Sequence, residues 1–411
     1  MDFSTFLLHI NDAINVQNGH TLAYMLRPTS PHSKDLVKEL RNRSYQSMMT
    51  HYRGSLVAPW DELAVRYVVM CGHVARKRSN EAFKEVLEMY SSFLKVFAES
   101  NGWLLNVLFS LSQVTRDLAL DAEAEGSIQG HWKPGDEPAS NAARVVTNGF
   151  KLCINDRMNP INVSRKWGVY YIAALVFKFY FKMKQIALAK NILRGVEIAD
   201  LPALTSYPRS HQVAYRYYLG MIDFMNENYT KAEKELEFAF YNCVTSATAN
   251  QERILSYLIA LRILKGLLPS EQLLSRFENV NKLYTPFIKA IKTGNLKAYD
   301  DALEAWESTL LKLSLYLIVE RARELCIRGL FRKVWLFEGK ATRIAIPKFY
   351  ASLKVSGIEE TSSEEAECFV ANMIYKGYMR GYIHHDKQMV LLSKDAFPPL
   401  KDRPDPFHTL S

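Results

Sequence analysis

The spacing of apolar residues is the feature that most constrains how this chain can fold. Up to about residue 340, apolar side chains recur every three or four positions, as at Ala82, Val86 and Tyr90. This spacing predicts successive amphipathic helices, and the alternation typical of strands is scarce. With 411 residues, the chain is also too long for one simple core, so we expect two or three packing units.

The pattern changes after Lys340 and predicts a winged helix. A helix over 324–337 is followed by an alternating β-branched strand over 342–346, and Pro347 opens a second helix. A third helix begins at Ser362, whose side chain can form a capping box with Glu365. Strands over 382–385 and 389–392 then flank a turn. The resulting order is helix, strand, helix, helix, strand, strand, with the final hairpin as the wing.

Helical pairs repeat before this region. Residues 228–240 carry a Y-x2-A-x3-L-x2-A pattern, and residues 294–306 echo it. The pattern resembles the second half of a tetratricopeptide repeat and favours a helical stack, with a non-repeating bundle as the alternative. The predicted fold is therefore mainly α, a tetratricopeptide-like helical stack followed by a C-terminal winged helix. The predicted parts are an N-terminal helical region (1–205) with a mobile loop near 122–142, a helical-repeat part (206–323), the winged helix (324–396) and an extended tail (397–411).

Positive charge is unevenly distributed along the chain. The formal net charge is +9, and residues 321–354 hold nine lysines and arginines against two acids, Glu324 and Glu338. A solvated helix face usually mixes both signs. The one-sided run therefore favours a polyanionic partner, either a nucleic acid or an acidic protein.

No motif of the sequence indicates catalysis or metal binding. The Walker A, HExxH, GxSxG and GxGxxG patterns are absent, and the five cysteines are scattered without a CxxC pair. His384 and His385 are adjacent, and neighbouring strand residues point to opposite faces, so the two cannot share one ion. We therefore expect a non-enzymatic protein without cofactor or metal. The longest apolar run, residues 169–181, is too short to cross a bilayer, so no membrane insertion is expected.

Four stretches carry a resemblance to a known family: RKWGVYYIAALVFKFYFK, NYTKAEKELEFAFYNC, LFRKVW and ANMIYKGYMRGYIHHDKQMVLLSKDAFPPL. They resemble the PCI-domain subunits of the nuclear messenger-RNA export complex at the pore, the family of PCI-domain-containing protein two. The fungal subunit-twelve proteins once assigned to the signalosome belong to the same family. The resemblance extends from about residue 165 to residue 400.

This resemblance implies a non-catalytic adaptor in the nucleus, associated with the nuclear envelope and pore. Its expected partners are a large helical scaffold subunit that also ends in a winged helix, a small acidic disordered subunit, and RNA, with DNA as a second candidate. The alternative is a signalosome-associated PCI subunit that acts only through protein–protein contacts, for example by pairing the free edge of its wing.

The candidate nucleic-acid contacts are the basic residues of the winged helix. Such groups bind phosphates and give affinity without sequence choice. Tyr378 and Tyr382 could stack on unpaired bases, although core packing is expected for at least one of them. We further expect a partner to cover part of the basic helix over 321–340. The predicted contacts are Arg343, Lys348, Lys354, Lys376, Arg380 and Lys387.

Overall fold

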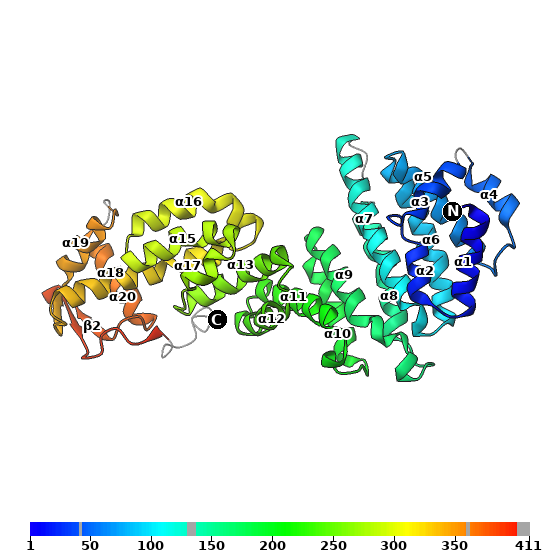
Figure 1. The fold of residues 1–411 in the computed structure, drawn as a ribbon. Coiled ribbons are helices and arrows are strands. Elements are labelled where there is room, and N and C mark those ends of the chain that lie inside the picture. The colour runs from blue at the N-terminus through cyan, green and yellow to red at the C-terminus, as the bar shows by residue number, and fades with distance from the viewer. Residues whose placement is uncertain (41–42, 130–136, 359–361, 401–411) are drawn as a thin grey trace. The chain divides into compact units, whose positions relative to one another are not determined.

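The computed structural model describes residues 1–40, 43–129, 137–358 and 362–400, and the chain divides into two compact units. The first unit covers residues 1–222 and the second covers residues 223–411 (Figure 1). The division lies within α11 (Arg209–Met225), whereas the sequence placed it at residue 205. Among the described residues, no helix is both long and apolar enough to cross a membrane.

The first unit is built from helices that mostly pack against their neighbours in the chain, with α5, α6, α7 and α8 in successive contact. Its core is rich in aromatic side chains, and Phe6, Phe93 and Phe97 are fully buried. The helices are α1 (Phe3–Asn15), α2 (Gly19–Met25), α3 (His32–Glu39), α4 (Tyr45–Tyr52), α5 (Trp60–Ala75), α6 (Ser79–Glu99), α7 (Leu105–Gln129), α8 (Pro138–Ile154), α9 (Val169–Lys182) and α10 (Ala189–Ile198).

Helices α7 and α8 occupy most of the segment for which the sequence predicted a loop. The loop was expected near 122–142, but α7 continues to Gln129 and α8 begins at Pro138. Glu123 on α7 accepts a hydrogen bond from the backbone amide of Ala139, which satisfies one donor at the start of α8. The glycines and acids that suggested a loop therefore lie partly within helices. The remainder, residues 130–136, lies outside the described residues.

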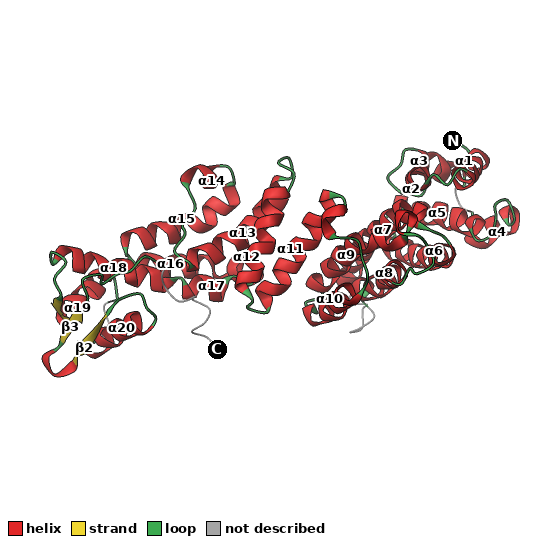
Figure 2. Cartoon of the chain, turned by 90° about the horizontal axis from the view of Figure 1, so that it is seen from below, coloured by secondary structure: helices red, strands yellow, loops and turns green. Residues whose placement is uncertain are grey.

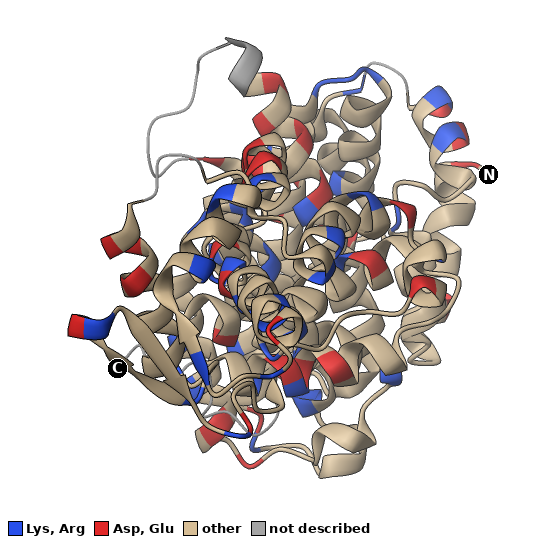
Figure 3. Ribbon diagram, turned by 90° about the vertical axis from the view of Figure 1, so that its left-hand side faces the viewer, with Lys and Arg blue, Asp and Glu red and all other residues tan. Residues whose placement is uncertain are grey.

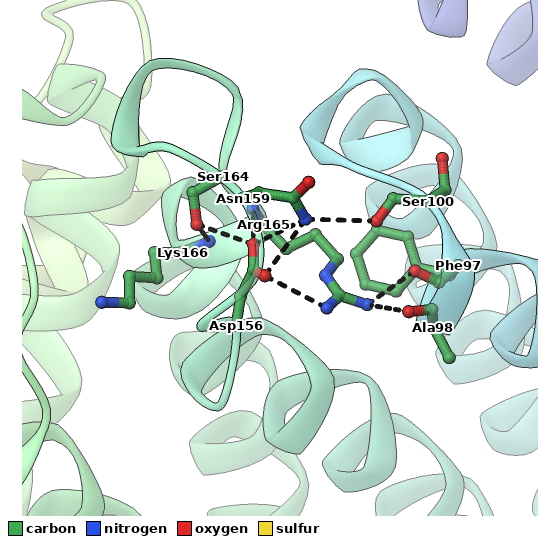
Figure 4. A network of polar contacts seen from close by, with 8 residues as sticks. All are labelled: Phe97, Ala98, Ser100, Asp156, Asn159, Ser164, Arg165 and Lys166. Atoms are coloured by element: carbon green, nitrogen blue, oxygen red, sulfur yellow. Dashed lines mark hydrogen bonds and ion pairs between the residues drawn. The ribbon is translucent and has the colours of Figure 1, made fainter.

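A buried ionic network joins the end of α6 to the segment after α8 (Figure 4). The Asp156 side chain is completely buried and accepts hydrogen bonds from the Ser164 hydroxyl, the Arg165 backbone amide and the Arg165 guanidinium, at 2.7, 2.8 and 3.2 Å. Arg165 also donates to the carbonyl oxygens of Phe97 and Ala98 at 2.8 and 2.7 Å. Burial alone would raise the pKa of Asp156, but the bonds from Ser164 and Arg165 outweigh it and hold that pKa well below its usual range.

The second unit begins with a stack of helices. The predicted repeat pattern is confirmed on α12, whose buried residues are Tyr229, Ala232, Leu236 and Ala239. The echo in α16 also buries its first turn through Leu296 and Tyr299. The stack consists of α12 (Tyr229–Asn242), α13 (Thr248–Leu264), α14 (Glu271–Ser275), α15 (Glu278–Thr293), α16 (Leu296–Lys312) and α17 (Tyr316–Arg321).

A common turn joins several of these helices. Gly294 has a left-handed backbone with φ of +70°, and the Asn295 amide donates to the carbonyl oxygen of Ala290 at 3.2 Å. Glu227 adopts the same conformation ahead of α12, with φ of +60°. A left-handed residue, followed by an amide that donates to the carbonyl oxygen five residues before it, defines the Schellman motif. This motif ends one helix and lets the next begin within a few residues.

The C-terminal part is a winged helix, as the sequence predicted. It consists of α18 (Arg323–Phe337), β1 (Arg343–Ala345), α19 (Ile346–Val355), α20 (Ser363–Tyr375), β2 (Gly381–His384) and β3 (Met389–Leu392). The strands form an antiparallel sheet in the order β1-β3-β2 (yellow in Figure 2). The capping box of α20 is present, with Ser362 and Glu365 each bonding the other's backbone amide.

The segment after the wing corrects part of the predicted tail. The sequence placed an extended tail at 397–411, but Phe397 is buried and its ring lies 5.6 Å from that of Trp335 on α18. Arg328 donates a hydrogen bond to the carbonyl oxygen of Pro398 at 2.8 Å. Residues 397–400 therefore belong to the packed second unit, and residues 401–411 lie outside the described residues.

Candidate nucleic-acid interface

The register of the wing sheet separates an inner from an outer face. Ile344 on β1 pairs with Val390 on β3, and both side chains are buried against the helices. Arg343 lies opposite Leu391, and Leu391 lies opposite Tyr382 on β2. Because side chains alternate between the faces of a sheet, these three residues form one row across its outer face.

This outer row combines a cation with an exposed aromatic ring. Arg343 is exposed, Leu391 is half-buried, and the Tyr382 side chain is 62% exposed. A guanidinium can contact a phosphate, and a tyrosine ring at the same surface can stack on a base. The sequence suggested both residues separately, but only the strand register places them in one row.

The two candidate tyrosines have different environments. Tyr378 is 2% exposed, whereas Tyr382 lies on the outer face of the wing. The expectation of core packing for at least one of them is therefore met by Tyr378. Only Tyr382 has the exposure that base stacking needs.

Three of the six predicted phosphate contacts have acidic partners. Lys376 pairs with Glu324 on α18, and Lys348 pairs with Glu338. Arg380 lies 2.9 Å from Asp395. A carboxylate at this distance offsets most of the field that a phosphate would experience, so these side chains are less suited to bind an anion than their number suggests.

The other three predicted contacts, Arg343, Lys354 and Lys387, have no ion pair among the described residues. Arg343 and Lys387 are exposed, on β1 and in the turn of the wing. The Lys354 ammonium lies 4.9 Å from the centre of the Tyr350 ring, a cation–π contact that leaves its charge uncompensated. Only three of the six predicted residues are thus available to bind a phosphate, fewer than the sequence indicated.

The basic segment over 321–354 also has acids beside it in the fold that lie outside the segment in the sequence. Arg323 lies 2.6 Å from Asp300, and Arg321 lies 4.0 Å from Glu227. These acids come from α16 and from the turn before α12. In Figure 3, Lys and Arg are interspersed with Asp and Glu. Part of the run therefore stabilises the helical stack, and only part can bind a polyanion.

Helix α18 has both buried and exposed large apolar residues. Leu325, Phe331 and Trp335 are buried, whereas the Phe337 side chain at its end is 90% exposed. Tyr375, at the end of α20, is 82% exposed. The sequence does not mark Phe337 or Tyr375 as surface residues, because nothing in the helical spacing distinguishes an apolar residue of the last turn from one in the core.

The two adjacent histidines have separate environments. His385 Nδ1 lies 2.8 Å from a carboxylate oxygen of Glu367 on α20, and this hydrogen bond raises the pKa of His385. His384 ends β2 opposite Met389. His385 therefore links the wing to α20.

The comparisons with known proteins agree with this architecture. Residues 303–394 match the family model of the PCI domain, which covers the end of the helical stack and the winged helix. Together, the fold and this match define a PCI-domain protein.

Several relatives extend the similarity over most of the chain. The chain is 38% identical to the protein CSN12 homolog of Schizosaccharomyces pombe, over 84% of each chain. It is 33% identical to the CSN12 homolog of Mycosarcoma maydis, over 97% of this chain and 98% of the relative. It is 28% identical to PCI domain-containing protein 2 of Xenopus laevis, over 96% and 97% respectively. The chain therefore belongs to the family of the CSN12 homologs.

Proposed function

We propose that this protein is a non-catalytic adaptor subunit of a messenger-RNA export complex that associates with the nuclear pore and acts together with transcription. In this role it binds RNA, and secondarily DNA, through the outer face of its winged helix. A large helical scaffold subunit and a small acidic disordered subunit complete the assembly. Membership of the CSN12 family supports the role of a PCI scaffold subunit.

The observation that carries the nucleic-acid role is the row formed by Arg343, Leu391 and Tyr382. It places a cation and an exposed ring on one face of the sheet, and Lys354 and Lys387 add uncompensated charge on α19 and in the wing turn. Together these groups supply phosphate contacts and one stacking surface. They provide affinity for single strands with little sequence preference.

The acids of α20 argue against the groove-reading mode of many winged helices. Glu364 and Glu365 lie in the first turn of this helix, where they are favoured by the helix dipole. Inserting that turn between two phosphate backbones would bring like charges together. The wing and the nucleic-acid backbone are therefore the proposed points of contact.

Charge reversal tests this role. In the complex with its scaffold, changing Arg343, Lys354 and Lys387 together to Glu is expected to weaken binding of single-stranded RNA by about a hundredfold or more, since three favourable contacts become repulsive. Fluorescence anisotropy at fixed salt measures the dissociation constant.

Lys312→Glu is the matched control, because Lys312 is an exposed lysine on α16, away from the wing. Its charge reversal is expected to change RNA affinity by less than about twofold, the scale of a screened distant charge. Unchanged RNA binding in the triple variant, with the scaffold still bound, would contradict the nucleic-acid role of this face.

A second candidate function is that of an assembly subunit associated with the signalosome, acting only through protein contacts. The observation in its favour is that β2 lies at the edge of the sheet, with β3 on its inner side, so another chain could add a strand there. Isolating the tagged protein from cells distinguishes the two candidates. We expect an export scaffold and a small acidic protein, whereas a full set of signalosome subunits would favour the second candidate.

A further inference from the structure

The exposed ring at the end of α18 is not used by the proposed function. The Phe337 side chain is 90% exposed, whereas Phe331 and Trp335 on the same helix are buried. A single exposed apolar residue is common on protein surfaces. The groups around Phe337 therefore decide whether the ring forms part of a site.

Helix α18 carries Phe337 next to the end of α15. The Lys333 ammonium donates a hydrogen bond to the carbonyl oxygen of Thr293 at 2.5 Å, and the Cys326 thiol donates to that of Ala290 at 3.2 Å. The two helices therefore lie side by side (Figure 1). Residues four apart share one face of a helix, so Phe337 lies one turn beyond Lys333 on the side that faces α15. Lys333 itself is engaged at the end of α15, which leaves its charge less available to a ligand.

Unpaired cations lie in the segments on both sides of this ring. Lys292 is exposed in the last turn of α15, and Lys340 is exposed in the turn after α18. Neither lysine has an ion pair within the described ranges of the chain. The acid that follows Phe337 in the sequence, Glu338, is paired with Lys348. The surroundings of the ring therefore favour a negatively charged ligand.

The turn after α18 leads into the outer row of the wing. The carbonyl oxygen of Thr342 accepts a hydrogen bond from the Leu392 amide at 2.8 Å, so this turn runs alongside the end of β3. Arg343 follows directly on β1 and lies in the outer row with Tyr382 on β2. These two edge strands are about 10 Å apart, because β3 lies between them. A ligand that contacts both Tyr382 and Phe337 must therefore be several nucleotides long.

We propose that Phe337 is a second base-stacking residue, and that the RNA-binding surface continues from the outer row of the wing across the turn after α18 to the end of α15. Lys340 and Lys292 contact phosphates of the nucleotides next to the stacked base. The ligand is a single strand, because the bases of a duplex stack on one another and do not reach separate rings. This inference rests on the proposed function and names the form of RNA that the site takes.

A protein partner is the other candidate for an exposed phenylalanine. The apolar surface around Phe337 is small, since Leu336 is 39% exposed and the residues that follow are Glu338, Gly339 and Lys340. The centre of a stable protein interface is larger and poor in charged residues. One ring with unpaired cations near it suits a base with its flanking phosphates better.

Substitution of Phe337 in the complex with the scaffold tests the proposal. The probe is a fluorescent, unstructured RNA of about twelve nucleotides, within the usual range of single-strand sites, and anisotropy measures its dissociation constant. Phe337→Ala is expected to weaken binding about tenfold, the scale of one lost stacking contact. Phe337→Tyr should bind within about twofold of the unchanged protein, whereas Phe337→Leu should bind like the alanine variant, because leucine is apolar but has no ring. Since the side chain is exposed, none of the three should lower the thermal midpoint appreciably.

The form of the RNA and the position of the charge give two further readouts. The same RNA annealed to its complement should bind Phe337→Ala within about twofold of the unchanged protein, since a duplex presents phosphates but no free base face. Lys292→Glu should weaken binding of the single strand about fivefold. Arg332→Glu is the matched control, because Arg332 is exposed on α18 but lies about 140° around the helix from Phe337. Its change should alter affinity by less than about twofold.

Single-strand affinity that survives Phe337→Ala or Phe337→Leu, or equal losses on the single strand and the duplex, would overturn this inference. The triple charge reversal of Arg343, Lys354 and Lys387 separates this failure from that of the proposed function. If the triple variant still weakens RNA binding, the wing keeps its nucleic-acid role and only the role of Phe337 is lost. Loss of the scaffold from the Phe337→Ala complex would assign the ring to a protein contact and would also overturn the inference.

Discussion

The Asp156 network of the first unit and the winged helix of the second use the same kinds of charged group in different ways. Asp156 and Arg165 are 0% and 7% exposed, and several hydrogen bonds engage both, although Nε of Arg165 has no partner among the described residues. On the wing, Arg343 and Lys387 are exposed and have no ion pair among the described residues. A buried charge must have its partners within the fold, whereas an exposed unpaired charge remains available to bind another molecule. The paired, buried charges therefore stabilise the fold, whereas the unpaired, exposed charges of the wing form the candidate binding surface.

Breaking the buried network is expected to have the largest effect on stability. Asp156→Ala leaves the Arg165 guanidinium buried without its carboxylate, and this should lower the free energy of unfolding by about 3–5 kcal/mol. Urea denaturation followed by circular dichroism measures the loss. The control is Asp200→Ala, since Asp200 is fully exposed and its carboxylate is 3.9 Å from Lys166. A loss for Asp156→Ala no larger than that of the control would show that the network is not structural.

Lowering the pH should destabilise the first unit through protonation of His211. Burial near the rings of Phe109 and Tyr171 lowers the pKa of His211 to about 4. This pKa is lower in the folded than in the unfolded chain. The free energy of unfolding is therefore unaffected by His211 above pH 6.5, and it falls as the pH drops from 6.5 towards 4. The loss is expected to be about 2 kcal/mol, after allowance for the partial exposure of the ring.

His211→Phe should remove this part of the pH dependence, as measured by urea denaturation at pH 7 and pH 4.5. His385 provides the contrast on the wing. Its ring is exposed and its pKa is raised by Glu367, so His385→Phe should leave the acid-induced loss in place. An unchanged pH profile in His211→Phe would contradict the role given to burial.

The two tyrosines extend the comparison within the winged helix. Tyr382→Ala is expected to cost about 1–3 kcal/mol of binding free energy for single-stranded RNA, the usual value of one stacked base. Its stability should change by less than about 0.5 kcal/mol, as for most exposed positions. Tyr378→Ala should instead destabilise the buried core of the winged helix. RNA affinity that survives Tyr382→Ala would remove the stacking part of the proposal.

The sequence predicted the elements of the winged helix and the helix α12 of the stack because their signals are local. The capping box of Ser362 and Glu365 is separated by three residues, and the Tyr229–Ala232 spacing lies within one helix. The ion pairs could not be predicted in this way. Arg323 and Asp300 are 23 residues apart, and Lys376 and Glu324 are 52 residues apart, so only the fold brings them together.

The predicted site also depends on contacts between residues that are far apart in the sequence. Counting charges along residues 321–354 gave a strongly basic segment, but Asp300 on α16 and Glu227 before α12 lie beside two of its cations. The row of Arg343 and Tyr382 depends on the register of three strands, which alternation alone does not specify. The loop expected near 122–142 failed for a related reason, since contacts such as that of Glu123 with Ala139 stabilise helices through residues that favour turns.

The salt dependence of RNA binding in two matched triple variants tests whether the unpaired cations of the winged helix bind RNA. One variant neutralises the unpaired cations by changing Arg343, Lys354 and Lys387 to Gln. The other neutralises the paired cations, with Lys348, Lys376 and Arg380 changed to Gln. Each phosphate contact contributes about 0.7 to the slope of log affinity against log salt for a single strand. The first variant should therefore lower the slope by about 2 and the second by less than about 1. Equal slopes in the two variants, or a larger fall in the second, would show that the unpaired cations do not form the RNA-binding surface.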